Sequence, residues 1–369
     1  MKPRYAIVSI TRNGCRLGFE IHEKVSHDIS EIDMFFPEKF RDDFKDVLEG
    51  SGAPVFFSEK VKDLLEKIFD KYEGIIAVIS LGALIRLVAP LLRDKKTDPG
   101  VVVIDEKGEF VISALSGHVG GGNDLARLVA AKIGATPVIT TASDVQKTIA
   151  VDLLGKTSGW VMEESRFLTE ISAAVVNFEP VAIVQESGGD DWRPRDTPLA
   201  ENLVVYGSLD EALRGPAKYF IVITHRELCE MPQYKKLFKN KYVIFRPPVI
   251  GLGIGCNRNT PAEEIEEVVK STFKELKINL QSIGGAASID LKKDEPGLLS
   301  FCAKFGIVPV FYSAEQLNRA KIENPSETVF KHTGAYGVSE PAARLLTHRD
   351  DLLLVKKISG NVTISAGLF

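Results

Sequence analysis

The sequence predicts an α/β protein: an N-terminal region with a mainly parallel sheet, a middle α/β region, and a separate, smaller C-terminal α/β domain. Short apolar runs typical of strands alternate with helical patterns along the chain, which is characteristic of helices layered on parallel sheets. The 369 residues exceed what one core usually serves. A stiff Arg246-Pro-Pro248 break precedes a new apolar strand. We therefore expect domains at 1–144, 145–246 and 247–369.

In the N-terminal region, turn residues separate the predicted elements. Residues 106–108 form a turn between two apolar runs, which predicts a hairpin. Gly134 follows a helical pattern and is expected to end that helix. The predicted strands are 6–10, 75–80, 101–105, 109–114 and 138–141, and the predicted helices are 81–92 and 125–133.

The middle region is less regular, and the C-terminal domain begins with a glycine-rich strand. Thr260 and Glu263 have the spacing of a capping box, so a helix is expected to start there. The middle strands are expected at 181–184, 203–206, 220–223 and 242–245. The C-terminal domain is expected to add a strand from 249, helices near 296–305 and 341–346, and strands at 308–312, 352–355 and 362–365.

The composition is typical of a soluble globular protein and argues against several other classes. Hydrophobic residues make up 44% and charged residues 26% of the chain, as in ordinary soluble proteins. The formal net charge of −4 argues against a dedicated nucleic-acid binder. The four cysteines show no metal-ligand spacing, and no apolar run is suited to a signal peptide or a membrane span. We expect a cytoplasmic protein without a metal site of its own, without nucleic acid and without membrane contacts.

The most informative motif is Ser116-Gly-His-Val-Gly-Gly-Gly-Asn123, between a predicted strand and a predicted helix. Glycines let backbone N–H groups approach an anion closely, and a helix N-terminus adds positive potential. His118 titrates near neutral pH and is the candidate for moving a proton. The amides of Gly120, Gly121 and Gly122 are expected to hold an oxyanion or carboxylate, whereas Asn123 or Asp124 is most simply a helix cap.

A second glycine turn, Gly251-x-Gly253-x-Gly255, follows the first C-terminal strand. Its spacing is not that of a dinucleotide fingerprint, and no Gly-Lys-Ser/Thr follows to make a phosphate loop. Two interpretations stay open from spacing alone. The turn is either a tight strand-to-helix connection or a carboxylate or phosphate cradle with Arg258 beside it.

A polar cluster follows at residues 324–337. Hydroxyl groups, a carboxylate and glycines suit a polar ligand, although an elaborate turn has the same composition. Glu327 is a candidate base, but a cap or a surface ion pair is commoner for such a residue. Arg86 stands in an otherwise apolar helical stretch and is either a snorkelling end or an anion ligand.

Five motifs in order resemble one known family. The run from Leu87 to Val103 and the Ser116–Asn123 motif are similar to the N-terminal part of the CbiG family, the cobalt-precorrin-5A hydrolases of anaerobic cobalamin biosynthesis. The blocks 253–260, 294–298 and 324–338, continued by 359–363, are similar to its C-terminal domain. That half also resembles a stand-alone protein of the aerobic pathway, so the N-terminal motifs indicate the hydrolase.

The resemblance implies opening of the ring A δ-lactone of a cobalt-tetrapyrrole and release of the C20 carbon as acetaldehyde. It implies no cofactor, because the cobalt arrives in the substrate, and it leaves open contacts with neighbouring pathway enzymes and a homodimer. A non-catalytic cobalt-tetrapyrrole carrier of the same pathway is the alternative. From the chemistry we predict catalytic roles for His118 and Glu327. The predicted substrate-binding residues are Arg86, Ser116, Gly117, Gly120, Gly121, Gly122, Asn123, Gly253, Gly255, Arg258, Ser326, Thr328, Thr333 and Tyr336.

Overall fold

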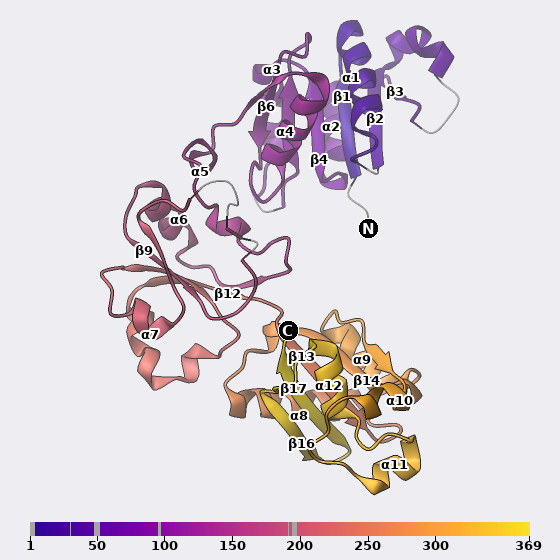
Figure 1. Cartoon of the computed structure of the whole chain (residues 1–369). Helices are drawn as coiled ribbons and strands as arrows, with labels where there is room; N and C mark the ends of the chain where they lie inside the picture. Colours follow the sequence, from indigo (N-terminus) through magenta and orange to yellow (C-terminus); the bar gives the residue numbers. More distant parts are fainter. Residues whose placement is uncertain (1–3, 30, 48–51, 95–96, 191, 194–197) are drawn as a thin grey trace. The chain divides into compact units, whose positions relative to one another are not determined.

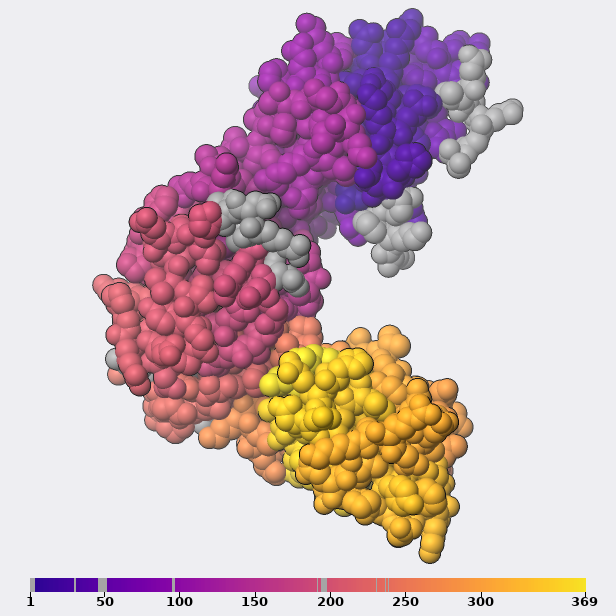
Figure 2. Space-filling view, viewed as in Figure 1, coloured from indigo at the N-terminus to yellow at the C-terminus, as the bar shows by residue number. Residues whose placement is uncertain are grey.

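In the computed structural model, the described residues form three β-sheets, with helices between their strands along the chain (Figure 1). It describes residues 4–29, 31–47, 52–94, 97–190, 192–193 and 198–369, and the remaining residues are grey in Figure 2. The chain divides into two compact units, Met1–Leu153 and Leu154–Phe369. The predicted α/β class and the mainly parallel N-terminal sheet are confirmed.

The first unit holds a seven-stranded sheet in the order β3-β2-β1-β4-β5-β6-β7. Its pairs are parallel except for β5 and β6, which form the predicted hairpin. The strands are β1 (Arg4–Ser9), β2 (Glu31–Pro37), β3 (Val55–Phe57), β4 (Gly74–Val78), β5 (Gly100–Ile104), β6 (Phe110–Leu115) and β7 (Thr136–Val138). The helices are α1 (Arg12–Val25), α2 (Val61–Ile68), α3 (Leu81–Val88), α4 (Gly122–Ile133) and α5 (Ala142–Val145).

Successive side chains of the central strands point to opposite faces of the sheet, so the buried apolar residues of this unit form one core on each face. Ile7 and Ile76 pack with the apolar sides of α1 and α4. Ala6 and Ile75, their chain neighbours, pack with α2 and α3 on the opposite face. The sheet is therefore covered by helices on both sides, and the turn before α4 follows strand β6 of this sheet.

The second unit holds two five-stranded sheets, in the orders β10-β9-β11-β12-β8 and β15-β14-β13-β17-β16. The middle strands are β8 (Val161–Glu164), β9 (Val181–Gln185), β10 (Leu203–Tyr206), β11 (Tyr219–Ile223) and β12 (Lys241–Arg246). The C-terminal strands are β13 (Ile250–Cys256), β14 (Ile283–Ile289), β15 (Val310–Tyr312), β16 (Leu354–Ser359) and β17 (Val362–Leu368).

The helices of this unit lie between its strands along the chain. They are α6 (Leu168–Val176), α7 (Leu209–Ala212), α8 (Ala262–Leu276), α9 (Pro296–Lys304), α10 (Ala314–Arg319), α11 (Glu327–Thr333) and α12 (Ser339–Thr347). Short 3-10 helices are η1 (Glu38–Val47), η2 (Phe69–Lys71), η3 (Ala89–Leu91), η4 (Val151–Leu153), η5 (Leu228–Glu230), η6 (Pro232–Lys239), η7 (Leu280–Ser282) and η8 (Asp290–Lys292). In the C-terminal sheet, α8 and α9 cover one face, and α10 and α12 pack against the other.

Two predicted helix starts are wrong. Helix α8 begins at Ala262 with Pro261 as its N-cap, and no side chain caps it. The Thr260 hydroxyl instead donates to the Asn257 carbonyl, because the buried Thr260 closes the preceding turn. Helix α4 is capped by Gly121 in the left-handed conformation, with φ of 77°. Asn123 and Asp124 therefore lie inside the helix rather than at its cap.

Candidate functional site

His118 lies in a small polar cluster in the first unit. Its Nε2 atom is 3.0 Å from Oδ2 of Asp144 and 3.0 Å from the Ser143 hydroxyl. Its Nδ1 atom is 3.4 Å from Oδ1 of Asp152. The side chain is 19% exposed and lines a cavity of about 60 Å³. Each ring nitrogen thus faces one carboxylate, an arrangement that the sequence did not predict.

The two carboxylates favour the protonated imidazole. The contact with Asp152 is the largest influence and raises the pKa of His118; burial opposes it, and Asp144 adds to the rise. Burial alone would raise the pKa of Asp144, but hydrogen bonds from Arg127 and His118 outweigh it, and that pKa is lowered. A doubly hydrogen-bonded imidazolium is suited to donating a proton and regaining it.

Helix α4 holds Asp144 in place. The Asn123 amide donates to Oδ2 of Asp144 over 2.8 Å and to the Thr141 hydroxyl over 3.1 Å. Arg127, one turn further along the helix, pairs with the other carboxylate oxygen. Asn123 is 3% exposed, so its amide positions this carboxylate from within the fold.

The glycines of this turn serve close packing. A Cβ on Gly120 would overlap Ser116, and one on Gly122 would approach the Leu115 carbonyl to 2.6 Å. The amides of Gly121 and Gly122 donate to the carbonyls of His118 and Ser116. Two of the three amides predicted to hold an oxyanion are therefore occupied within the turn.

Of the other predicted residues of this unit, Gly117 is close to the cluster and Arg86 is outside it. Gly117 lines the same cavity as His118, and a Cβ at this position would approach the Asn123 side-chain amide to 2.6 Å. Ser116 has a positive φ of 49° and forms the bend of the turn. The Arg86 guanidinium donates to the Gly82 carbonyl in its own helix, α3.

The C-terminal sheet carries a much larger pocket of about 650 Å³. Its walls are the end of β13, the segment after β14, one side of α11, the first turn of α12, and the β16–β17 hairpin. Among the predicted residues, Gly255, Arg258, Thr328 and Thr333 line it.

The remaining predicted residues of this domain have other contacts. Ser326 caps α11 by accepting from the Val329 amide. Tyr336 stacks on Phe330 with ring centroids 4.4 Å apart. Glu327 lies exposed in the first turn of α11, where a negative charge complements the helix dipole.

The second glycine turn was interpreted either as a tight connection or as a ligand cradle, and its glycines differ in which of the two they fit. A Cβ on Gly253 would overlap the Ser339 carbonyl of α12, so this glycine permits helix-to-strand packing. At Gly255 the nearest atom would be 3.5 Å away, on Val338. Gly253 is therefore a packing residue, whereas Gly255 borders the pocket, where an added methyl group would make only ordinary contacts.

Arg258 is held beside the pocket by two acidic neighbours. Its Nη1 atom donates to Asp294 over 2.6 Å, and its Nη2 atom donates to the Leu291 carbonyl. Asp294 is the largest cause of a raised Arg258 pKa. The fully buried Glu295 accepts from the Asn259 amide and from Lys292, over 2.7 and 3.2 Å. These contacts fix the turn after β13.

Lys292 and Lys356, which the sequence did not indicate, also line this pocket, as does His332, which lies in the polar cluster 324–337 but was not among the predicted site residues. Lys356 follows Val355 in an alternating strand beside a second lysine, Lys357, and the sequence shows no reason to choose between them. His332 is four residues after Thr328 on the same helix, and that spacing was the available signal.

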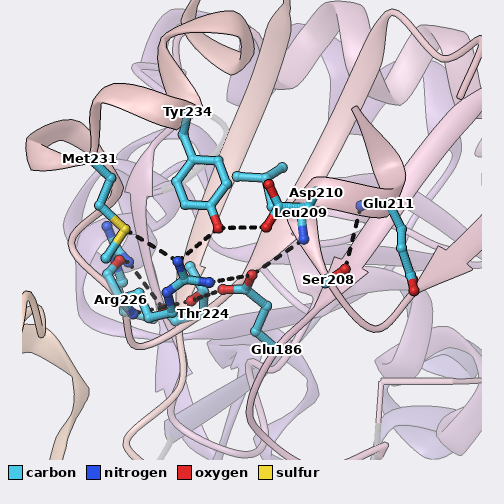
Figure 3. A network of polar contacts seen from close by, with 10 residues as sticks. Glu186, Ser208, Leu209, Asp210, Glu211, Thr224, Arg226, Met231 and Tyr234 are labelled. Carbon is cyan, nitrogen blue, oxygen red and sulfur yellow. Dashed lines mark hydrogen bonds and ion pairs between the residues drawn. The ribbon is translucent and has the colours of Figure 1, made fainter. Parts of the chain in front are cut away.

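A third polar cluster lies at the carboxyl ends of β9 and β11 (Figure 3). Arg226 donates to Glu186 over 2.9 Å and to the Tyr234 hydroxyl over 2.8 Å. Glu186 also accepts from the Thr224 hydroxyl, and Tyr234 donates to Asp210. Arg226, Glu186 and Asp210 each have a partner within this cluster (Figure 3), so the cluster joins the strand ends of the middle sheet.

The described residues hold neither a cluster of metal ligands nor a helix suited to a membrane. No group of three or more histidine, cysteine, aspartate or glutamate side chains there is arranged to hold a metal ion. Among the same residues, none of the helices has the length and apolar character needed to cross a membrane.

Family models match three successive parts of the chain. Residues 63–144 match "Cobalamin synthesis G N-terminal", residues 149–247 match "Cobalamin biosynthesis central region", and residues 250–367 match "Cobalamin synthesis G C-terminus".

Relatives that match most of this chain have names from the same pathway. A cobalt-precorrin-5A hydrolase from Priestia megaterium is 48% identical over 366 residues, covering 99% of this chain and 94% of the relative. One from Salmonella typhimurium is 32% identical, covering 81% and 83%. A crystal structure of a cobalamin biosynthesis protein G homologue from Sulfolobus solfataricus is 23% identical with a TM-score of 0.40, covering 99% and 97%. With three family models and relatives matched along most of their length, the chain belongs to the cobalamin synthesis G (CbiG) family.

Proposed function

We propose that this protein is a cobalt-precorrin-5A hydrolase. Relatives with this name match it at 48% and 32% identity over most of both chains. The reaction opens the ring A δ-lactone and releases the C20 carbon with its methyl group as acetaldehyde. The cobalt belongs to the substrate, and the protein supplies proton transfer and carboxylate binding.

The observation that carries the mechanism is the placement of His118 between two carboxylates. Its raised pKa increases the protonated fraction at neutral pH. As the lactone C–O bond breaks, the leaving alkoxide oxygen takes a proton from His118, and the attacking water returns one to the ring. The cluster then regains its starting charge, and the net change of this step is addition of one water across the lactone bond, which leaves a hydroxyl group on C20. Release of acetaldehyde then breaks the bond from C20 to the macrocycle: the hydroxyl proton leaves as the C=O forms, and the macrocycle keeps the electron pair of the broken bond and takes up a proton.

The decisive experiment is anaerobic incubation of the purified chain with cobalt-precorrin-5A while acetaldehyde is trapped. The Priestia megaterium relative serves as the positive control for the substrate preparation. We expect acetaldehyde with wild-type protein and a loss of about 100-fold or more in rate for His118→Ala. The matched control is His27→Ala, which removes an exposed histidine of the same unit and is expected to retain full rate.

Two results would contradict parts of this proposal. Tetrapyrrole binding without any acetaldehyde would replace the hydrolase by the carrier alternative. Wild-type acetaldehyde release by a folded His118→Ala variant would leave the reaction in place and remove His118 from it.

A further inference from the structure

We propose that the C-terminal pocket binds side-chain carboxylates of the tetrapyrrole through Lys356, His332 and the N-terminus of α12. This inference rests on the proposed function, because it assumes a polycarboxylate substrate. It assigns the binding charge to residues other than Arg258, on which the sequence motif had placed it.

The first argument comes from the charges that line the pocket. Arg258 pairs with Asp294, and Lys292 pairs with the buried Glu295. Lys356 is partly buried, lines the pocket, and has no carboxylate partner among the described residues. A partly buried ammonium group without a counter-ion is unfavourable, and a bound carboxylate would compensate it.

The neighbouring lysine shows the contrast. Lys357 lies on the other face of β16, where its ammonium group donates to Glu275 of α8 over 2.7 Å. The strand therefore presents one lysine that is paired within the protein and one that faces the pocket. Only the second is available to a ligand.

The second argument comes from the start of α12. Residues Gly337 to Glu340 line the pocket, and no side chain caps this helix. Glu340 is in the first turn, but its carboxylate accepts from the backbone amides of Glu323 and Asn324 and pairs with Arg344. The positive end of the helix dipole therefore remains directed at the pocket.

The rest of the lining suits a large ligand with polar edges. His332 and Thr328 lie one turn apart on α11. Asn257 and Asn361 join the ends of β13 and β17 by an amide hydrogen bond of 2.8 Å. Ile289 and Val338 supply apolar surface. A volume of about 650 Å³ is within the range of small-molecule sites and leaves room for several carboxylate-bearing arms.

The test uses cobalt uroporphyrin III, an octacarboxylate tetrapyrrole that has no lactone, so binding is measured without the reaction. The full chain is titrated anaerobically, and the dissociation constant is followed by absorbance. We expect Lys356→Gln to weaken binding about 10-fold and Lys356→Glu to weaken it further. Lys357→Gln is the matched control, with unchanged affinity expected. The octamethyl ester of the same complex should bind all variants equally weakly.

Melting temperatures verify that each variant is folded, and His332→Gln provides a second position with an expected loss of about threefold to tenfold. Unchanged affinity in folded Lys356→Gln and Lys356→Glu would overturn the proposal, as would an ester that binds wild-type protein as tightly as the octacarboxylate does. Failure of the hydrolase proposal appears separately, as absent acetaldehyde release from cobalt-precorrin-5A by wild-type protein.

Discussion

The His118 cluster and the C-terminal pocket combine similar side chains in opposite ways. Around His118, two carboxylates face the two ring nitrogens, and the cavity is about 60 Å³. In the pocket of about 650 Å³, Lys356 lines the wall without a counter-ion among the described residues. The first arrangement compensates its charge internally, and the second leaves a charge for a ligand.

This difference suits the two regions to two tasks, proton transfer and anion binding. A group surrounded by its own hydrogen-bond partners is suited to holding a proton at a fixed position, because little reorganisation accompanies transfer. An uncompensated cation beside an open volume is suited to binding an anion. We therefore expect the first region to govern the rate of the chemical step and the second to govern substrate affinity.

The largest effect is expected from combining substitutions in both regions. If the two regions act on separate steps, the loss in kcat/KM for His118→Ala with Lys356→Gln should equal the product of the single losses, about 1000-fold or more. The His118 change should act on kcat and the Lys356 change on KM. Steady-state acetaldehyde release measures both. A double variant no worse than His118→Ala alone would show that the two regions are not independent.

A smaller effect distinguishes a glycine needed for packing from a glycine that has room for a methyl group. Gly253→Ala should destabilise the protein by about 3 kcal/mol, because the new methyl group overlaps the Ser339 carbonyl. Gly255→Ala, two residues later in β13, should change stability by less than about 0.5 kcal/mol. Urea unfolding measures both free energies. Equal destabilisation by the two substitutions would refute the distinction.

The smallest effect concerns the pH dependence of the reaction. If protonated His118 donates the proton, kcat falls as pH rises through its pKa, which contact with Asp152 raises. Asp152→Asn should move that alkaline limb to lower pH, and Asp144→Asn should move it less. The raised pKa also stabilises the fold at pH values below the unfolded pKa of histidine, and this contribution disappears as pH rises through the folded pKa.

The readouts are pH–rate profiles of acetaldehyde release and melting temperatures across the same pH range. Lys107→Gln, which removes an exposed lysine of the same unit, serves as the control for a general change in charge. An alkaline limb that stays in place in Asp152→Asn would mean that His118 does not control it.

Much of the architecture was predictable because strands and helices have different local periods. The alternation that places Ile7 and Ala6 on opposite faces is readable in the sequence. The hairpin around 106–108 and the helix ending at Gly134 follow from turn chemistry. The failed capping box at Thr260 shows the limit, since a buried side chain there bonds to an earlier carbonyl.

The candidate site was only partly predictable. His118 and the two glycine turns stand out in the sequence because their residue types are unusual at those positions. Asp144, in contrast, reaches His118 across 26 residues, and nothing local indicates that contact. The paired state of Arg258 depends in the same way on Asp294, 36 residues away.

The α/β class, the order of the elements and the histidine among glycines can all be read from the residue pattern alone. Tertiary structure decided which charges are compensated. Lys356 and Lys357 are chemically identical neighbours, yet only folding places one against Glu275 and the other in the pocket. The physical reason is that local periodicity fixes which side chains share a face, whereas the partner across that face comes from a distant part of the chain.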